Sequence, residues 1–202
     1  MTLLHIDASI LHEQSVSRQL TAAIVKRLTG ELPKTEVIRI DLAAEPLGHL
    51  SAEEFLAFRG ITPQSEEAKQ AAARNAKTLN DFLAADVIVI GAPMYNFSLP
   101  SQLKAWLDRI AVPGATFRYT ANGIEGLANG KRVIIASSRG GQYTEATPAA
   151  FLDHQETYLR DFFGFLGVAD VTFVRAEGLA ISEESRTAAI DAAKADIENL
   201  AV

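Results

Sequence analysis

Apolar residues gather along this chain in five short runs rich in β-branched side chains, and each run predicts a β-strand. The clearest is Val87–Ala92, in which every position from Val87 to Ile90 is apolar. Continuous apolar runs of this length are typical of strands buried on both faces of a parallel sheet. The five expected strands are Thr2–Asp7, Glu36–Asp41, Val87–Ala92, Arg132–Ser137 and Asp170–Ala176.

Between these strands the apolar residues recur with helical spacing. Val16, Leu20, Ile24 and Leu28 form one stripe, which predicts a helix from Ser15 to Leu28 with Ser15 or Ser17 as N-cap. A short helix is expected to begin at Ser51 with a capping box, and the last helix is expected to begin at Ser182. Three more helices are expected from Thr62-Pro63 to Leu83, from Pro100 to Ile110, and from Thr147-Pro148 to about Phe165. The turn-rich residues 111–130 are expected to form an irregular segment or a hairpin.

Strands that alternate with helices predict an α/β fold, in which a five-stranded parallel sheet carries helices on both faces. The chain has 202 residues, 48% of them hydrophobic and 22% charged. This is ordinary globular composition, and no linker or repeat interrupts it. One domain over residues 1–202 is therefore expected.

Composition excludes several classes of function. The chain contains no Cys, so disulfides, thiolate nucleophiles and Cys-ligated zinc are ruled out, and its four His lack metal-ligand spacing. A net charge of −6 argues against nucleic acid as a partner. No apolar run approaches the roughly 18 residues of a membrane span, and no signal peptide is apparent. We therefore expect a cytoplasmic protein without a metal site.

The loop after the first expected strand carries hydroxyl groups at Ser9, Ser15 and Ser17, directly before a helix. Backbone N–H groups at a helix start favour an anion, so this loop is a candidate phosphate site. The alternative is that the serines only cap the helix. The loop contains neither GxxxxGK[ST] nor GxGxxG, which favours a phosphate monoester over a triphosphate or a pyrophosphate.

Two further loops follow the third and fourth expected strands. The first carries Met94, Tyr95, Asn96 and Phe97, which suit a flat and partly polar ligand, and the second is Ser138-Arg139-Gly140-Gly141. A glycine pair lets a ligand approach the backbone closely, although it is also compatible with a simple turn. Arg139 is also compatible with a charge that is only solvated. A helix N-terminus contributes about 0.3–1 kcal/mol to a bound anion, whereas micromolar affinity requires about 8 kcal/mol. The rest must come from the two other loops, and one phosphate joined to a flat ring with polar edges describes FMN.

The run Ala92–Phe97, followed by Pro100 and Leu103-Lys104, resembles the flavin-ring loop of the flavodoxin-like NAD(P)H-dependent reductases. The whole chain resembles the FMN-dependent NADH-azoreductases, which are also quinone reductases; Ser15–Ser17, Thr116–Thr120 with Asn122-Gly123, and Ser138–Gly141 match that family in order. The resemblance implies a flavodoxin-like fold and a homodimer with two FMN sites at its interface. By position, it assigns Ser9, Ser15, Val16 and Ser17 to the phosphate, Met94, Tyr95, Asn96 and Phe97 to the ring, and Ser138, Arg139, Gly140 and Gly141 to its polar edge.

The expected chemistry belongs to the flavin, and no side chain is assigned as a catalytic acid or base. Because no second dinucleotide motif is present, NADH or NADPH and a quinone or azo acceptor are expected to use one site in turn, in a ping-pong cycle. Candidates for the substrate pocket are Arg59, Phe117, Tyr119, Tyr143 and Phe162, the last of which also fits core or dimer packing. The alternative functions are a flavodoxin-type electron carrier, which binds FMN without oxidising NAD(P)H itself, and a flavin-free binding module.

Overall fold

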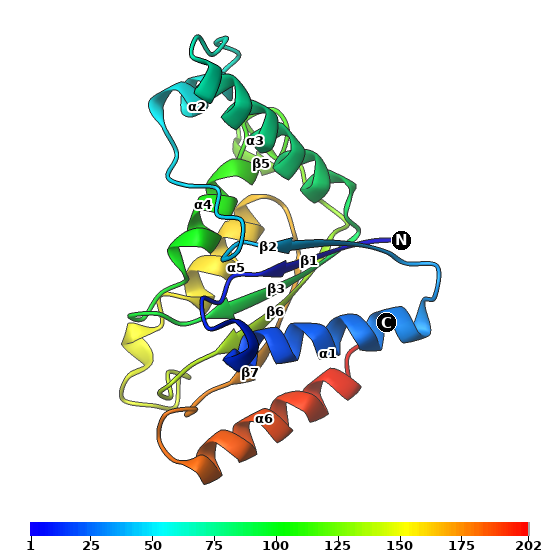
Figure 1. The fold of residues 1–202 in the computed structure, drawn as a ribbon, viewed down its shortest axis with the longest axis vertical. Coiled ribbons are helices and arrows are strands. Elements are labelled where there is room, and N and C mark those ends of the chain that lie inside the picture. The colour runs from blue at the N-terminus through cyan, green and yellow to red at the C-terminus, as the bar shows by residue number, and fades with distance from the viewer. Residues whose placement is uncertain (202) are drawn as a thin grey trace.

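A computed structural model describes residues 1–201 and contains one five-stranded parallel sheet (Figure 1). Its order is β2-β1-β3-β6-β7, and every neighbouring pair is parallel. The strands are β1 (Thr2–Asp7), β2 (Glu36–Asp41), β3 (Val87–Pro93), β6 (Arg132–Ser138) and β7 (Asp170–Ala176). The predicted strands and the flavodoxin-like α/β class are confirmed. All strand carboxyl ends therefore meet at one edge, where open α/β sheets bind their ligands.

Helices cover both faces of the sheet, as predicted. They are α1 (Val16–Glu31), α2 (Ala52–Ala57), α3 (Glu66–Ala84), α4 (Ser101–Ile110), α5 (Glu156–Phe165) and α6 (Glu183–Glu198), with short 3-10 turns η1 (His12–Gln14) and η2 (Ala150–Leu152). Helices α1 and α6 lie side by side on one face, whereas α3, α4 and α5 pack on the other (Figure 1). Successive strand residues point to opposite faces, so each face receives its own apolar set.

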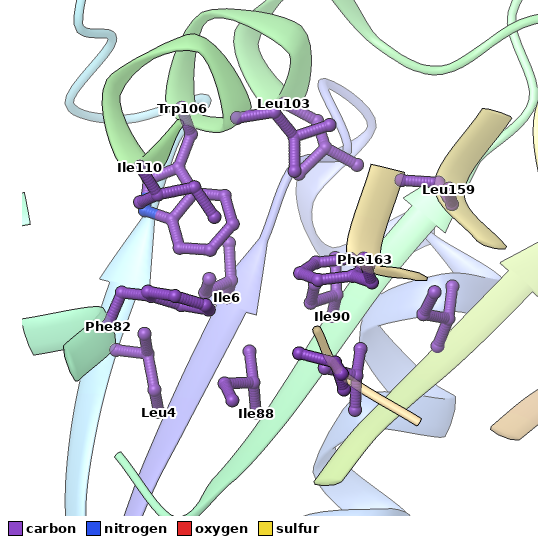
Figure 2. Close-up of a cluster of buried hydrophobic side chains, with 14 of the residues drawn as sticks. Leu4, Ile6, Phe82, Ile88, Ile90, Leu103, Trp106, Ile110, Leu159 and Phe163 are labelled. Carbon is purple, nitrogen blue, oxygen red and sulfur yellow. The ribbon is translucent and has the colours of Figure 1, made fainter. Parts of the chain in front are cut away.

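The larger core lies under α3, α4 and α5 (Figure 2). Ile88 and Ile90 of β3 point into it, whereas Val87 and Val89 join the core under α1 and α6. In the larger core the Phe82 and Trp106 rings meet edge to face, with centroids 6.1 Å apart. Each fully buried side chain of this kind contributes about 1.5–3 kcal/mol. The sheet is thus fixed from both sides, which gives the loops at its edge a rigid base.

Two predicted helix starts are wrong, and both errors come from side-chain capping. The third helix begins at Glu66, because the Ser65 hydroxyl accepts from the Ala68 N–H; Thr62-Pro63 lies outside it. The helix predicted from Thr147-Pro148 is instead the turn η2 followed by α5. The Asp153 carboxylate accepts from the N–H groups of residues 155 and 156 and so starts α5 there. The predicted caps at Ser15 and Ser51 are confirmed.

The segment 111–130 contains the antiparallel hairpin β4 (Phe117–Thr120) and β5 (Gly123–Gly126), as predicted. It packs against the carboxyl end of α5: the Ala128 N–H donates to the Leu166 carbonyl at 2.8 Å. The amino end of α5 instead lies at the strand carboxyl ends, where the Gln155 amide donates to the Ala92 carbonyl at 2.7 Å. A ten-residue helix is about 15 Å long, so the hairpin and the loop edge lie at opposite ends of α5.

Candidate active site

Three loops meet at the carboxyl edge of the sheet (Figure 1). The Tyr95 hydroxyl lies 3.2 Å from the Ser9 hydroxyl and accepts from the Ile10 N–H at 3.3 Å, which joins the first loop to the second. The Met94 N–H donates to the Ser138 carbonyl at 2.8 Å, which joins the second loop to the third. Residues that are far apart in the sequence thus form one continuous site.

The first loop ends at the N-terminus of α1. The Ser15 hydroxyl accepts from the Arg18 N–H at 3.3 Å and lies 3.0 Å from the Ser17 hydroxyl. Within residues 1–201, the N–H groups of Val16 and Ser17 donate to no other group. Capping by Ser15 and two unclaimed N–H donors therefore coexist, so the capping interpretation does not exclude anion binding. Hydroxyls and N–H groups at a helix start suit a phosphate.

The second loop holds two residues in the left-handed region. Asn96 has φ 47° and Phe97 has φ 71°, conformations that cost non-glycine residues about 1 kcal/mol or more each. Reciprocal bonds between Tyr95 and Ser98 hold the turn, and the His154 N–H donates to the Phe97 carbonyl at 3.2 Å. The Phe97 side chain is left 41% exposed. The surrounding contacts thus maintain a strained turn that offers an aromatic ring to the site.

The third loop has its carbonyl groups occupied by the segment after β7. The N–H groups of residues 178, 179 and 180 donate to the carbonyls of Gly141, Arg139 and Gly140, at 2.8, 3.1 and 3.0 Å. Within the described residues, the N–H groups of Gly140 and Gly141 donate to nothing. Unclaimed backbone N–H groups of this kind are donors that suit a carbonyl oxygen or a developing negative charge.

The side chain of Arg139 is fully buried, so its interpretation as a solvated charge is wrong. Its guanidinium contacts the carboxylates of Asp153 at 2.9 Å, Glu156 at 2.7 Å and Glu177 at 3.5 Å. Nε also donates to the Gln155 side chain at 3.1 Å. Its backbone N–H donates to the Ala176 carbonyl. Arg139 therefore shapes the frame beneath the glycine pair.

Of the predicted substrate-pocket residues, Tyr143 lies beside the loops. Its ring meets that of Phe97 edge to face, with centroids 6.0 Å apart, and its N–H donates to Glu177 at 3.0 Å. A Cβ added at Gly141 would lie 2.8 Å from the Tyr143 hydroxyl. Phe162 stacks on Tyr158 at 5.9 Å and packs against the larger core, in line with the core-packing alternative.

The other three pocket candidates belong to the hairpin β4–β5 and to the segment that follows α2, and Figure 1 shows β5 and α2 apart from the carboxyl ends of the sheet strands. Phe117 is buried, with its ring centroid 4.6 Å from that of Phe165, whereas Tyr119 is 73% exposed on the same hairpin. Arg59 follows α2, and its guanidinium lies 4.8 Å from the centroid of the Phe55 ring. A single chain does not bring these residues to the strand edge.

Three residues that hold the site were missed from the sequence: Arg18, Asp41 and Gln155. Arg18 binds Asp41 and the Ser9 carbonyl, and Gln155 joins the Ala92 carbonyl to Arg139. Asp41 ends the strand next to β1, so the strand order would have pointed to it. Gln155 gave no comparable signal, because its position depends on where α5 begins.

Two other kinds of feature are absent from the described part of the chain. Within residues 1–201, no group of three or more His, Cys, Asp or Glu side chains is placed to hold a metal ion. Over the same residues, no helix combines the length and the apolar character needed to cross a membrane. The three loops at the strand edge thus remain the site with the clearest ligand chemistry.

The sheet order, with its ligand edge beside a helix N-terminus, defines a flavodoxin-type domain. A family model described as "Flavodoxin-like fold" matches residues 1–201. The FMN-dependent NADH:quinone oxidoreductase of Methylocella silvestris is 56% identical over 191 residues, 94% of each chain. That of a Bradyrhizobium species is 53% identical over the full length of both. The FMN-dependent NADH-azoreductase of Bacillus anthracis, solved with FMN, superimposes with a TM-score of 0.88 at 27% identity, covering 98% of this chain and 96% of that one. The chain belongs to the flavodoxin-like family and, within it, to the FMN-dependent NADH:quinone oxidoreductases.

Proposed function

We propose that this protein oxidises NADH or NADPH with bound FMN and passes two electrons to a quinone or an azo compound, in a ping-pong cycle. The observation that carries the proposal is the junction of three loops at one sheet edge through Tyr95 and Met94. One loop offers donors for a phosphate, the second an aromatic ring and the third unclaimed backbone N–H groups. The names of relatives at 53–56% identity support the same activity.

The residues present fit FMN by their donor chemistry. Val16 and Ser17 would hold the phosphate through their N–H groups at the start of α1. Gly140 and Gly141 would direct theirs at the polar edge of the ring, where preorganised donors stabilise developing negative charge. When bound, FMN supplies the two-electron chemistry, and the protein supplies orientation and electrostatics.

The proposed ping-pong order is supported by the single cofactor edge. A flat ring at the three loops would lie beside the Phe97–Tyr143 aromatic pair. The nicotinamide and the acceptor would then occupy this place one after the other. Aromatic side chains in edge-to-face contact form a rigid apolar wall, against which either planar substrate can pack.

The proposal includes a homodimer in which each site is completed by the other chain. The support is the separation of the hairpin from the strand edge. Tyr119 is 73% exposed, and its hairpin packs at the carboxyl end of α5, whereas the amino end of α5 lies at the strand edge. Exposed aromatic side chains of this kind are typical of contact surfaces. A cytoplasmic location is also proposed, in keeping with a chain without cysteine.

Steady-state kinetics test the activity. The FMN-loaded protein is assayed with NADH and NADPH against a panel of quinones and azo dyes, and the acceptor concentration is varied at several fixed donor concentrations. Parallel double-reciprocal lines are expected. Intersecting lines would reject the ping-pong order. FMN binding without NAD(P)H consumption would instead identify a flavodoxin-type carrier.

Mixed dimers test the shared site. A Tyr119→Ala chain keeps its loops but has an altered hairpin, whereas a Ser17→Glu chain keeps its hairpin but opposes the phosphate by charge. Each variant alone is expected to have at least tenfold lower quinone reductase activity. The purified mixed dimer should recover one functional site, hence about half of wild-type activity. Absence of recovery would place the hairpin and the loops of one site on the same chain.

A further inference from the structure

We propose that Arg18 is a positioning residue for the phosphate loop, which sets the loop's geometry through hydrogen bonds without touching the phosphate. The proposal rests on the proposed function, since it takes FMN as the ligand of this loop. It assigns Arg18 a role opposite to that usually given to an arginine beside a phosphate, which is to bind it directly.

The Arg18 guanidinium is partly exposed, and its donors are engaged by groups of its own chain. Nη1 and Nη2 donate to the two carboxylate oxygens of Asp41, at 2.6 and 2.7 Å. Nη2 and Nε also donate to the Ser9 carbonyl, at 2.8 and 3.3 Å. The Arg18 backbone N–H donates to the Ser15 hydroxyl. One residue therefore connects the loop after β1, the N-cap of α1 and the end of β2.

The charge of Arg18 is also compensated. Besides Asp41, the buried carboxylate of Asp7 lies 3.8 Å from Nη1. The Arg18 guanidinium holds the pKa of Asp41 at about 2, so both partners are ionised near neutral pH. Asp7 is further bonded by Thr21 and Arg39. A phosphate at the start of α1 would thus meet little net positive charge from this group, and its binding depends on correctly placed N–H and hydroxyl donors.

The Ser9 carbonyl is a sensitive point at which to hold the loop. The hydroxyl of the same residue accepts from the Leu11 N–H at 3.3 Å and lies 3.2 Å from the Tyr95 hydroxyl. Release of the carbonyl would therefore shift the loop after β1 and its junction with the second loop. Hydrogen bonds weaken steeply with misalignment, so small shifts cost affinity.

A comparison of FMN with riboflavin isolates the phosphate. Flavin-free full-length protein is titrated with each ligand, and the dissociation constant is measured from quenching of flavin fluorescence. Arg18→Met should raise the dissociation constant for FMN about tenfold or more, and that for riboflavin less than about twofold. Arg18→Lys, which keeps the charge but loses the bidentate geometry, should fall between Arg18→Met and wild type. The matched control is Arg27→Met, since Arg27 lies on the same helix and, within residues 1–201, pairs with exposed Glu31 alone.

Asp41→Ala separates position from charge. This variant removes the bidentate partner and leaves the Arg18 charge uncompensated by Asp41. If Arg18 acts by position, FMN binding weakens in Asp41→Ala as well. If Arg18 acts as a cation, the freed charge tightens FMN binding, and the proposal is overturned.

Two further outcomes contradict the proposal. An equal rise in both dissociation constants would mean a general structural loss, and an unchanged FMN affinity in Arg18→Met would mean no role at the phosphate. Circular dichroism establishes that each variant is folded; if Arg18→Met is not, Arg18→Lys and Asp41→Ala decide. If the wild-type protein binds riboflavin and FMN with equal dissociation constants, the phosphate contributes nothing, and only the proposal for Arg18 is overturned. Binding of neither flavin would refute the proposed function together with it.

Discussion

The loop after β1, which is the proposed phosphate loop (residues 8–15), and the glycine loop (residues 138–141) are each held by an arginine paired with carboxylates. The two arginines, Arg18 and Arg139, differ in burial. Arg18 is 13% exposed, and its bidentate partner Asp41 is 26% exposed. Arg139 is fully buried among Asp153, Glu156 and Glu177. An arginine paired with carboxylates therefore holds the loop after β1 from a partly exposed position and the glycine loop from a fully buried one.

This difference determines what each arginine is worth. Near water, unpaired charges are solvated, so the loss of one partner disturbs mainly the local geometry. Inside the protein, loss of one partner leaves uncompensated buried charge, which is costly to the whole fold. We infer that Arg139 stabilises the whole fold, whereas Arg18 mainly fixes the geometry of the loop after β1.

The largest expected effect is on stability. Arg139→Met should lower the free energy of unfolding by about 3–5 kcal/mol, because the three buried or half-buried carboxylates of Asp153, Glu156 and Glu177 lose a partner. Urea denaturation measures this value, with Arg175→Met as the control: Arg175 also binds Glu156, but its side chain is 39% exposed. A loss in Arg139→Met no greater than in the control would remove the distinction between the two loops.

The second effect concerns the backbone N–H groups of Gly140 and Gly141, which we propose as donors to the flavin. Gly141→Leu should raise the dissociation constant for FMN about tenfold, because a Cβ there lies 2.8 Å from the Tyr143 hydroxyl and displaces that ring. Gly140→Ala is the control, since its nearest neighbour would lie at an ordinary 3.4 Å. Fluorescence titration with FMN compares them. Equal FMN affinities in Gly141→Leu and Gly140→Ala would count against a close approach of the flavin ring to Gly141.

The smallest effect is the pH dependence of the stability that the partly exposed Arg18–Asp41 pair contributes. The pKa of Asp41 is about 2 in the folded protein, against about 3.9 in an unfolded chain. Its stabilising contribution is therefore present above about pH 4 and is lost as the pH falls towards 2. After allowance for solvent screening, the stability difference between wild type and Asp41→Asn should be about 1–2 kcal/mol at about pH 6 and about half of that at pH 3. Urea denaturation at both pH values checks this, and a difference that grows on acidification would contradict it.

The sequence predicted the strands well because each is a distinct apolar run between turn residues. Val87–Ile90 had no other plausible place than a buried strand, and the helix stripes then fixed the α/β class. The start of α5 was mispredicted because Thr147-Pro148 is a sound local start signal, while Asp153 supplies a competing cap. Local signals therefore predicted which elements form better than where they begin.

The candidate site was predictable where its groups belong to the loops themselves. Ser15, Phe97 and Gly141 lie in the loops that follow three of the strands, so they were expected at the sheet edge. The supporting contacts were not predictable. Arg18 meets Asp41 only because β2 lies next to β1, and Gln155 reaches Arg139 and the Ala92 carbonyl only because α5 begins where it does. A lone arginine such as Arg139 also carries no sign in the sequence of whether it is buried.

The most direct test of the account is one anaerobic half-reaction. The FMN-loaded protein is mixed with one equivalent of NADH and no acceptor, while the visible absorbance of the bound flavin is followed. NADH should bleach this absorbance stoichiometrically, and one equivalent of a quinone should then restore it. If the flavin absorbance persists under NADH until an acceptor is present, the ping-pong oxidoreductase proposed for this protein is wrong.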